Sequence, residues 1–406
     1  MIVLRAFKTE LDLSNAQRTA CAKHAGAARY AYNWGLARKK EAYRAGLKMP
    51  TAIDLHRELN VLKKTELSWM YEASKCSPQE SLRNLDEAYA RFFRRVEEKK
   101  AGKKVKVGFP KFKSKKNGLG GFRLTGAIHV FDDAVQLPRL GRLRLKERGY
   151  LPTRGAKVLS AAVSERAGRW YVSIPVEMEM PEPAARDKPV VGVDLGVRHL
   201  ATLSDGVQFE NPRALRNDIQ RIKRLQRMVS RREKGGANRK RAVAQLARAH
   251  LRVANVRKDA LHQVTSLLAK TKSAVVLEDL NVSGLLRNHH LAQAIADVGL
   301  REFRRQLTYK GEWHGCKVFF ADPFYPSTKR CSNCGNVKVD TSLGERVYAC
   351  DVCGFVIDRD LNAALNLERL VSTGSSPGSH ACGEGVRPGM PAVLHEAGTE
   401  PRSALG

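Results

Sequence analysis

Two pairs of cysteines lie near the C-terminal end, Cys331-Ser-Asn-Cys334 and Cys350-Asp-Val-Cys353, with fifteen residues between them. Together they supply four thiolates that can close tetrahedrally on one zinc ion. Four thiolates leave no open coordination position, so we expect this zinc to be structural rather than catalytic. The spacing disfavours the alternative, a set of buried thiols without a metal.

Three acidic residues are placed where they could meet. Val190-Val-Gly-Val-Asp194 and Ala274-Val-Val-Leu-Glu278 are each an apolar strand followed by an acid, and Asp360 begins a helix. In an RNase H-like order the two strands are neighbours about 4.8 Å apart, and ligands collect at their carboxyl ends. An Asp-Glu-Asp cluster can hold two Mg²⁺ ions, with Mn²⁺ as a substitute, and clamp a phosphodiester during hydrolysis. We therefore predict Asp194, Glu278 and Asp360 as catalytic magnesium ligands.

Each acid also has a simpler interpretation. Asp194 or Glu278 alone could merely start an exposed loop, and Asp360 could be a helix N-cap. Asp358 can take that capping role, which leaves Asp360 free. Asn362 and Asn366 lie one turn apart on one helix face, and the small residues between them allow close approach to a sheet.

The charge balance indicates a polyanionic partner. The chain has 72 Lys and Arg against 41 Asp and Glu, a formal charge of +31. Such a protein attracts nucleic acid, and its binding should weaken steeply with salt. The segment Lys103–Lys116 alternates basic and aromatic residues, which favours phosphate contact with base stacking; a solvated lysine loop is the alternative.

Other features point to the cytoplasm. The sequence has no apolar run of roughly 18 residues and no charged-then-apolar leader, so we expect neither membrane insertion nor secretion. The remaining cysteines, Cys21, Cys76, Cys316 and Cys382, are scattered singly. That distribution favours reduced thiols and a metal site over disulfides.

The pattern of apolar residues predicts a multidomain α/β protein. Ser14 and a capping box at Ser77-Pro78-Gln79-Glu80 mark helix starts, and Gly235-Gly236 marks the bend of a basic helical hairpin. The expected parts are a small β-barrel or β-sandwich (1–10 and 105–185), a helical block (11–104), a linker (181–189), an RNase H-like nuclease domain (186–322 and 356–372), a zinc ribbon (323–355) and a disordered tail (373–406).

These residues resemble the TnpB family, the nucleases of bacterial insertion sequences that are similar to type V CRISPR effectors. The resemblance rests on Arg29-Tyr-Ala-Tyr-Asn33, Gly108-Phe-Pro-Lys-Phe-Lys-Ser114, Gly192-Val-Asp-Leu-Gly196, Leu277-Glu-Asp-Leu-Asn281, Tyr309-Lys310, the paired cysteines and Asp358-Arg-Asp-Leu-Asn-Ala-Ala-Leu-Asn366. It implies a wedge-like barrel interrupted by a helical recognition block, and a RuvC-type nuclease domain with an inserted zinc ribbon.

By this resemblance the family's catalytic acids fall on Asp194, Glu278 and Asp360, and its zinc ligands on the paired cysteines. The implied activity is RNA-guided cleavage of DNA. The implied partners are a transposon-encoded guide RNA and a target DNA with a short adjacent motif, and we expect a monomeric ribonucleoprotein. Base pairing would then read the sequence while the protein reads shape and the motif.

Two other functions compete with this interpretation. An actin-like or hexokinase-like ATPase also begins with Gly-Val-Asp-Leu-Gly and a hairpin, but should carry a second glycine-rich phosphate loop, and the sequence has none. A non-cleaving RNA- or DNA-binding regulator of transposition would need the zinc ribbon and the basic surface but not the acids. The complete set of acids favours the nuclease.

Overall fold

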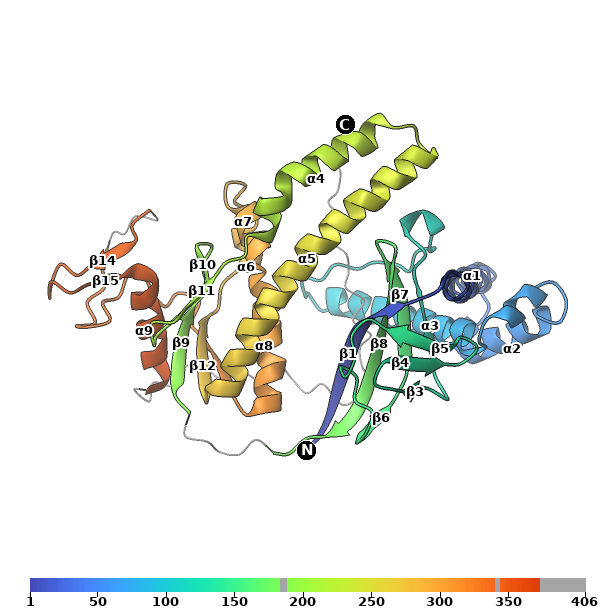
Figure 1. Cartoon of the computed structure of the whole chain (residues 1–406), viewed down its shortest axis with the longest axis horizontal. Coiled ribbons are helices and arrows are strands. Elements are labelled where there is room, and N and C mark those ends of the chain that lie inside the picture. The colour runs from blue at the N-terminus through green and yellow to red at the C-terminus, as the bar shows by residue number, and fades with distance from the viewer. Residues whose placement is uncertain (183–187, 340–343, 373–406) are drawn as a thin grey trace. The chain divides into compact units, whose positions relative to one another are not determined.

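The computed structural model describes residues 1–182, 188–339 and 344–372. The chain divides into two compact units, Met1–Pro181 with Asp218–Asn255, and Glu182–Asn217 with Val256–Gly406 (Figure 1). Most of the predicted linker, the predicted tail and Cys382 lie outside the described residues.

The first unit contains an antiparallel sheet built around the N-terminal strand. β1 (Ile2–Asp12) pairs with β8 (Arg169–Glu179) from Ile2↔Glu179 to Glu10↔Tyr171, and then with β5 (Gly141–Leu145). The sheet order is β2-β7-β8-β1-β5-β4-β3, and β6 also pairs with β8. The remaining strands are β2 (Gly121–Leu124), β3 (His129–Val130), β4 (Ala134–Leu137), β6 (Ala156–Val158) and β7 (Ala161–Arg166). Alternate side chains such as Val172, Ile174 and Val176 are buried, as period-two strands require. Closure of this sheet into a barrel stays a prediction.

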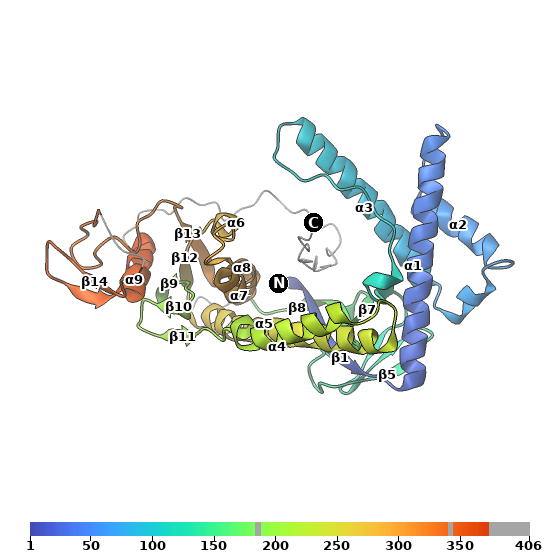
Figure 2. The ribbon, with the colours of Figure 1, turned by 90° about the horizontal axis from the view of Figure 1, so that it is seen from above.

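Helices fill the chain between β1 and β2. They are α1 (Asn15–Arg44), α2 (Ala52–Leu62), the 3-10 turn η1 (Ser68–Glu72), α3 (Cys76–Lys100) and the 3-10 turn η2 (Lys115–Asn117); α1, α2 and α3 pack together (Figure 2). The helix start predicted at Ser14 is confirmed, because Ser14 and Gln17 form a reciprocal capping box.

The capping box predicted at Ser77 is wrong. α3 begins at Cys76, and its N-cap residue Lys75 makes no side-chain capping bond. The Ser77 hydroxyl is buried inside the helix and donates to the carbonyl of His24 on α1, at 2.8 Å. The Ser77 hydroxyl, which the local sequence predicted to cap the helix, therefore bonds to a neighbouring helix instead.

The basic and aromatic segment before β2 is fastened to α1. Asn33 donates its amide to the Lys113 carbonyl at 2.9 Å and accepts from the Lys113 N–H at 2.8 Å. The Lys113 ammonium lies 3.9 Å from the centre of the Tyr32 ring, and burial lowers its pKa. The Phe109 ring meets Phe92 edge-on, with centroids 5.1 Å apart. These contacts hold the segment against α1 and α3, yet Phe109 and Phe112 stay 42% and 53% exposed. Its contact with nucleic acid stays a prediction.

A helical hairpin of α4 (Ala214–Arg231) and α5 (Ala237–Thr271) follows the strands of the second unit. Gly235 has φ +96, which confirms the predicted bend. Arg239 donates to the carbonyls of Val229 and Arg232 across this bend. At the base of the hairpin, buried Asp297 accepts the Leu215 and Arg216 N–H groups, which stabilises the start of α4.

The second unit is built on a mixed five-stranded sheet of order β11-β10-β9-β12-β13. Its strands are β9 (Val190–Asp194), β10 (His199–Leu203), β11 (Gln208–Glu210), β12 (Ala274–Glu278) and β13 (Lys317–Ala321). β12 runs parallel to both β9 and β13, while β10 is antiparallel to its two neighbours. This arrangement of three antiparallel strands followed by two parallel ones confirms the predicted order.

Helices cover both faces of this sheet. Leu261 and Leu268 of α5 and Phe303 of α8 (Leu300–His314) pack on one face, together with the sheet residues Val193 and Val275. α9 (Arg359–Ser372) covers the other face (Figure 1). Two short helices, α6 (Val282–Leu285) and α7 (Ala292–Val298), lie between β12 and α8 in sequence.

Gly192 sets how closely α9 approaches the sheet. A Cβ at this position would lie 1.9 Å from the Ala364 carbonyl oxygen, so no other residue fits without moving the helix. Ala363 and Ala364 are fully buried, as predicted for a close helix-to-sheet contact. Gly192 therefore lets α9 carry its first turn to the end of β9.

Among the helices of the described ranges, none is long and apolar enough to cross a membrane.

Candidate functional site

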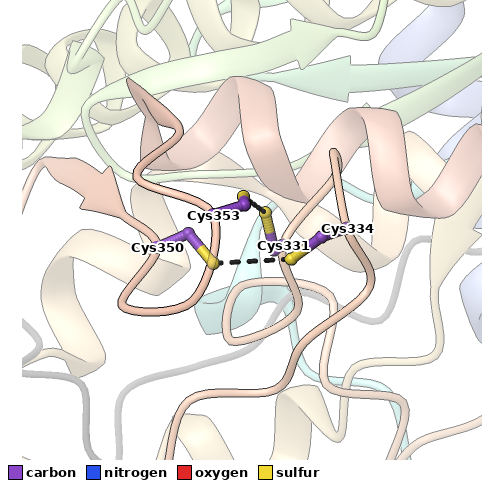
Figure 3. Close-up of side chains that lie close together, drawn as sticks. All are labelled: Cys331, Cys334, Cys350 and Cys353. Carbon is purple, nitrogen blue, oxygen red and sulfur yellow. Dashed lines mark hydrogen bonds between the residues drawn. The ribbon is translucent and has the colours of Figure 1, made fainter.

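The four paired cysteines come together in the loop between β13 and α9. The sulfur atoms of Cys331, Cys334, Cys350 and Cys353 all lie within 4.8 Å of one another (Figure 3). Two of the separations are 3.7 Å, from Cys331 to Cys353, and 3.6 Å, from Cys334 to Cys350. A tetrahedral zinc site with Zn–S bonds of about 2.3 Å separates its sulfurs by about 3.8 Å, whereas a disulfide needs about 2.05 Å. The four cysteines can therefore hold one zinc ion.

Both cysteine pairs have the same backbone geometry. Gly335 donates its N–H to the Cys331 carbonyl and Gly354 donates to the Cys350 carbonyl, each at 3.0 Å. Both glycines have positive φ, +81 and +68, which the tight turn after the second cysteine requires. The backbone N–H of Phe355 and the Asn333 amide lower the pKa of Cys353 to about 6, whereas the pKa of Cys334 in the same cluster is raised to about 12, with the neighbouring thiols contributing to the rise.

The cysteine loop is fixed to α9 by two asparagines. Asn362 donates to the Arg330 carbonyl at 2.7 Å and accepts from the Ser332 N–H at 2.9 Å. Asn366 donates to the carbonyls of Arg330 and Ser327, at 2.6 and 2.8 Å. The sequence predicted that these two asparagines share one face of α9, but it did not predict that they bond to the cysteine loop. The loop that carries the first cysteine pair is thus bonded directly to the helix that carries Asp360.

The three predicted acids lie at one edge of the second unit. Asp194 and Glu278 are the last residues of β9 and β12, and the Leu277↔Val193 pairing makes them neighbours. Asp360 is in the first turn of α9 and is buried. Asp358 accepts the N–H groups of Asp360 and Leu361, at 2.9 and 3.1 Å. Asp358 is therefore the helix cap, as predicted, so capping does not require the Asp360 carboxylate, whose Oδ1 accepts a hydrogen bond from Arg359 at 3.4 Å.

Burial and mutual repulsion shape the electrostatics of these acids. Burial and the charges of Glu278 and Asp360 raise the pKa of Asp194 well above its ordinary value. Burial also raises the pKa of Glu278, and a hydrogen bond from Ser327 opposes that rise. The charges of both other acids therefore act on Asp194.

Ser327 was missed by the sequence analysis. Its buried hydroxyl donates to Oε1 of Glu278, while its carbonyl accepts from Asn366. Nothing in the local sequence marks it, because a serine after a proline is an ordinary loop residue. The contact exists only because the start of the cysteine loop returns to the end of β12.

The three carboxylates are more widely spaced than the thiols. In the part of the chain that the structure describes, the four cysteines form the only group of three or more His, Cys, Asp or Glu residues whose ligand atoms all lie within 4.8 Å of one another. Oxygen donors of this kind suit Mg²⁺ and Mn²⁺ rather than zinc.

Three family profiles match the chain. The profile described as "Probable transposase" matches residues 173–289, and "Cas12f1-like, TNB domain" matches residues 301–367. The profile described as "Helix-turn-helix domain" matches residues 1–48, which here form β1 and α1.

Curated proteins match over nearly the whole length. A protein of Streptomyces pristinaespiralis named "Putative RNA-guided DNA endonuclease" is 35% identical, covering 95% of this chain and 92% of its own. "Putative RNA-guided DNA endonuclease InsQ" of Escherichia coli (strain K12) is 32% identical, covering 96% of each chain. Among solved structures, the cryo-EM structure of a Cas12f1–sgRNA–target DNA complex matches with a TM-score of 0.54 and 11% identity, covering 90% of this chain and 99% of that one. The fold is thus that of the RuvC-containing Cas12 effectors.

Proposed function

Because the chain belongs to the TnpB family, we propose that it is an RNA-guided DNA endonuclease that hydrolyses phosphodiesters at Asp194, Glu278 and Asp360. One observation carries this proposal. The three acids, far apart in sequence, meet at one edge of an RNase H-like sheet, in a chain whose full-length relatives are named as RNA-guided DNA endonucleases. A merely solvated acid would not be buried beside two others.

The acids fit two Mg²⁺ ions, for which Mn²⁺ can substitute. Burial raises the pKa of both Asp194 and Glu278, and the neighbouring acids raise that of Asp194 further, so a compensating cation is needed to keep these carboxylates ionised near neutral pH. When bound, such ions supply a hydroxide-like nucleophile and neutralise charge on the leaving oxygen. Asp194, Glu278 and Asp360 would hold these ions.

The chain's own residues orient this site. Asp358 holds the first turn of α9, which fixes the direction of the Asp360 side chain. Ser327 holds one oxygen of Glu278 and leaves the other free to bind. The zinc ribbon has a structural role, because Asn362 and Asn366 join its first cysteine pair to α9.

The partners follow from the family and the charge. The guide is a transposon-encoded RNA, the target is DNA with a short adjacent motif, and the assembly is a monomeric ribonucleoprotein. The formal charge of +31 favours a long nucleic-acid ligand whose pairing, rather than protein contacts, reads the sequence.

The direct test is expression together with the native downstream sequence. We expect the purified protein to carry a discrete RNA and to cut only plasmids that match that RNA, with added Mg²⁺ or Mn²⁺. Sequencing the bound RNA identifies the guide. Bound RNA without cutting of any matched plasmid would instead support the non-cleaving regulator of transposition.

A second prediction concerns Ser327. Ser327→Ala leaves the Glu278 carboxylate without the hydroxyl that orients it, so we expect activity and affinity for the catalytic ion to fall by roughly 10- to 100-fold. Mn²⁺ titration followed by electron paramagnetic resonance measures the ion affinity without relying on cleavage, and zinc content should not change.

Ser332→Ala is the matched control. Ser332 is also buried in the cysteine loop, but its hydroxyl makes no hydrogen bond to the described residues. We expect this variant to keep normal Mn²⁺ affinity. Equal Mn²⁺ affinities in Ser327→Ala and Ser332→Ala would show that Ser327 does not position Glu278.

A further inference from the structure

A cavity of about 630 Å³ opens in the helical part of the first unit, between α1 and η1. Its walls include Lys23, Gly26, Tyr30, Trp34, Trp69 and Glu72. The proposed catalytic acids belong to the other unit, so hydrolysis does not account for this cavity.

Aromatic rings form much of its wall. Tyr30 and Trp69 are 39% and 43% exposed, and their rings meet edge-on with centroids 5.6 Å apart. Trp34 packs partly against the helical core beside them. Large aromatic side chains exposed together at a hollow are typical of a binding site, because a ligand buries surface that otherwise faces water.

Gly26 keeps the cavity open. A Cβ at Gly26 would meet no atom within 4 Å, so packing does not require glycine there. The contrast is Gly35 of the same helix, where a Cβ would lie 2.7 Å from a Leu82 methyl carbon. Glycine in the middle of a helix costs about 0.8–1 kcal/mol relative to alanine. Packing of the fold does not require glycine at position 26, and the absence of a side chain there leaves space in the cavity.

The polar residues of the wall suit a nucleotide. Arg29 lines the cavity and is held by a hydrogen bond to the Leu119 carbonyl, at 3.2 Å. Lys23 forms an ion pair with Glu72 at the same cavity. Aromatic faces with neighbouring cations are the usual platform for an unpaired base and its phosphate.

We propose that this cavity binds an unpaired base of the guide RNA, stacked on Tyr30 and Trp69 with its phosphate near Arg29. The inference rests on the RNA partner of the proposed function. We assign RNA because loops and bulges of a folded guide offer unpaired bases, whereas the target strand is paired with the guide. The displaced DNA strand is also unpaired, and the crosslinking test distinguishes it from the RNA.

The test uses the guide-loaded protein with 5-iodouridine placed in the unpaired positions of the RNA. Irradiation followed by mass spectrometry should find a crosslink at Tyr30 or Trp69. Gly26→Leu fills the cavity and Trp69→Leu removes a ring. Each should abolish this crosslink and weaken RNA binding about 5- to 150-fold, the range for one stacked base.

Two controls separate binding from folding. Tyr43→Leu removes an aromatic that is 76% exposed on the same helix and does not line the cavity; it should keep both the crosslink and the affinity. Gly26→Leu should melt no lower than the unmodified protein, because leucine favours a helix more than glycine does.

Other results would overturn the inference. A crosslink that forms only when iodouracil is in the DNA would assign the cavity to the target. Equal RNA affinity of Gly26→Leu and the unmodified protein would remove the base from the cavity while leaving the proposed function intact. A protein that binds no RNA would contradict both the base-binding cavity and the proposed RNA-guided function.

Discussion

Asp194→Asn is expected to lower matched-plasmid cleavage by at least about a thousandfold while guide-RNA binding is retained. The substitution removes a charged ligand from the proposed ion site, and the charge stabilisation that such ions would supply is worth several kcal/mol. The change is nearly isosteric and lies in the second unit, so the described contacts of the first unit stay intact. Cleavage of a matched plasmid and RNA binding measured on the same preparation test it.

The same variant should be more stable than the unmodified protein without Mg²⁺ at neutral pH. A raised carboxyl pKa means that the native state binds more protons than the unfolded state, so stability falls as pH rises through the ordinary carboxyl range. The asparagine variant escapes this loss. Its gain in melting temperature should therefore be present near pH 7 and disappear below the ordinary pKa of aspartate.

Asp205→Asn is the matched control for both measurements. Asp205 lies in the turn after β10 and pairs with Lys272 at 2.7 Å, which lowers its pKa. Its replacement should leave cleavage unchanged and give no gain in stability. Normal cutting by Asp194→Asn would rule out the proposed site.

Zinc removal should have the second large effect. We expect one zinc per chain, bound with an apparent free energy on the order of 10–16 kcal/mol, as in other structural sites of this type. Cys331→Ser should lose the zinc and release the loop that Asn362 and Asn366 hold. Because Ser327 belongs to the same loop, the Glu278 contact should be lost and cleavage should fall strongly. Metal analysis and cleavage assays measure the two effects.

Cys316→Ala provides the comparison. Cys316 is buried beside the sheet, outside the cysteine cluster, and burial raises its pKa to about 11, as expected of an inert thiol. This variant should keep its zinc and most of its activity. A folded Cys331→Ser protein with full zinc content would contradict the proposed zinc site.

Sequence reasoning succeeded where the signal is local. The apolar runs that end at Asp194 and Glu278 predicted buried strands, because both faces of such strands must be covered. Asp358 was recognised as a helix cap from its position alone. The prediction from sequence failed at Ser77, where the pattern of a helix cap lies within the first turn of α3. The Ser77 hydroxyl bonds to the carbonyl of His24 on α1 instead of capping its own helix.

The chain by itself determined the ligand types, their spacing and the order of strands around them. Cysteine chemistry predicts the metal, and periodicity predicts the strands, because both depend on residues close in sequence. Only the tertiary structure decided that Ser327 contacts Glu278, that Asn362 holds the cysteine loop, and that Gly26 borders an aromatic cavity. These contacts join segments that are distant in sequence, and packing, rather than any local pattern, selects which polar groups meet.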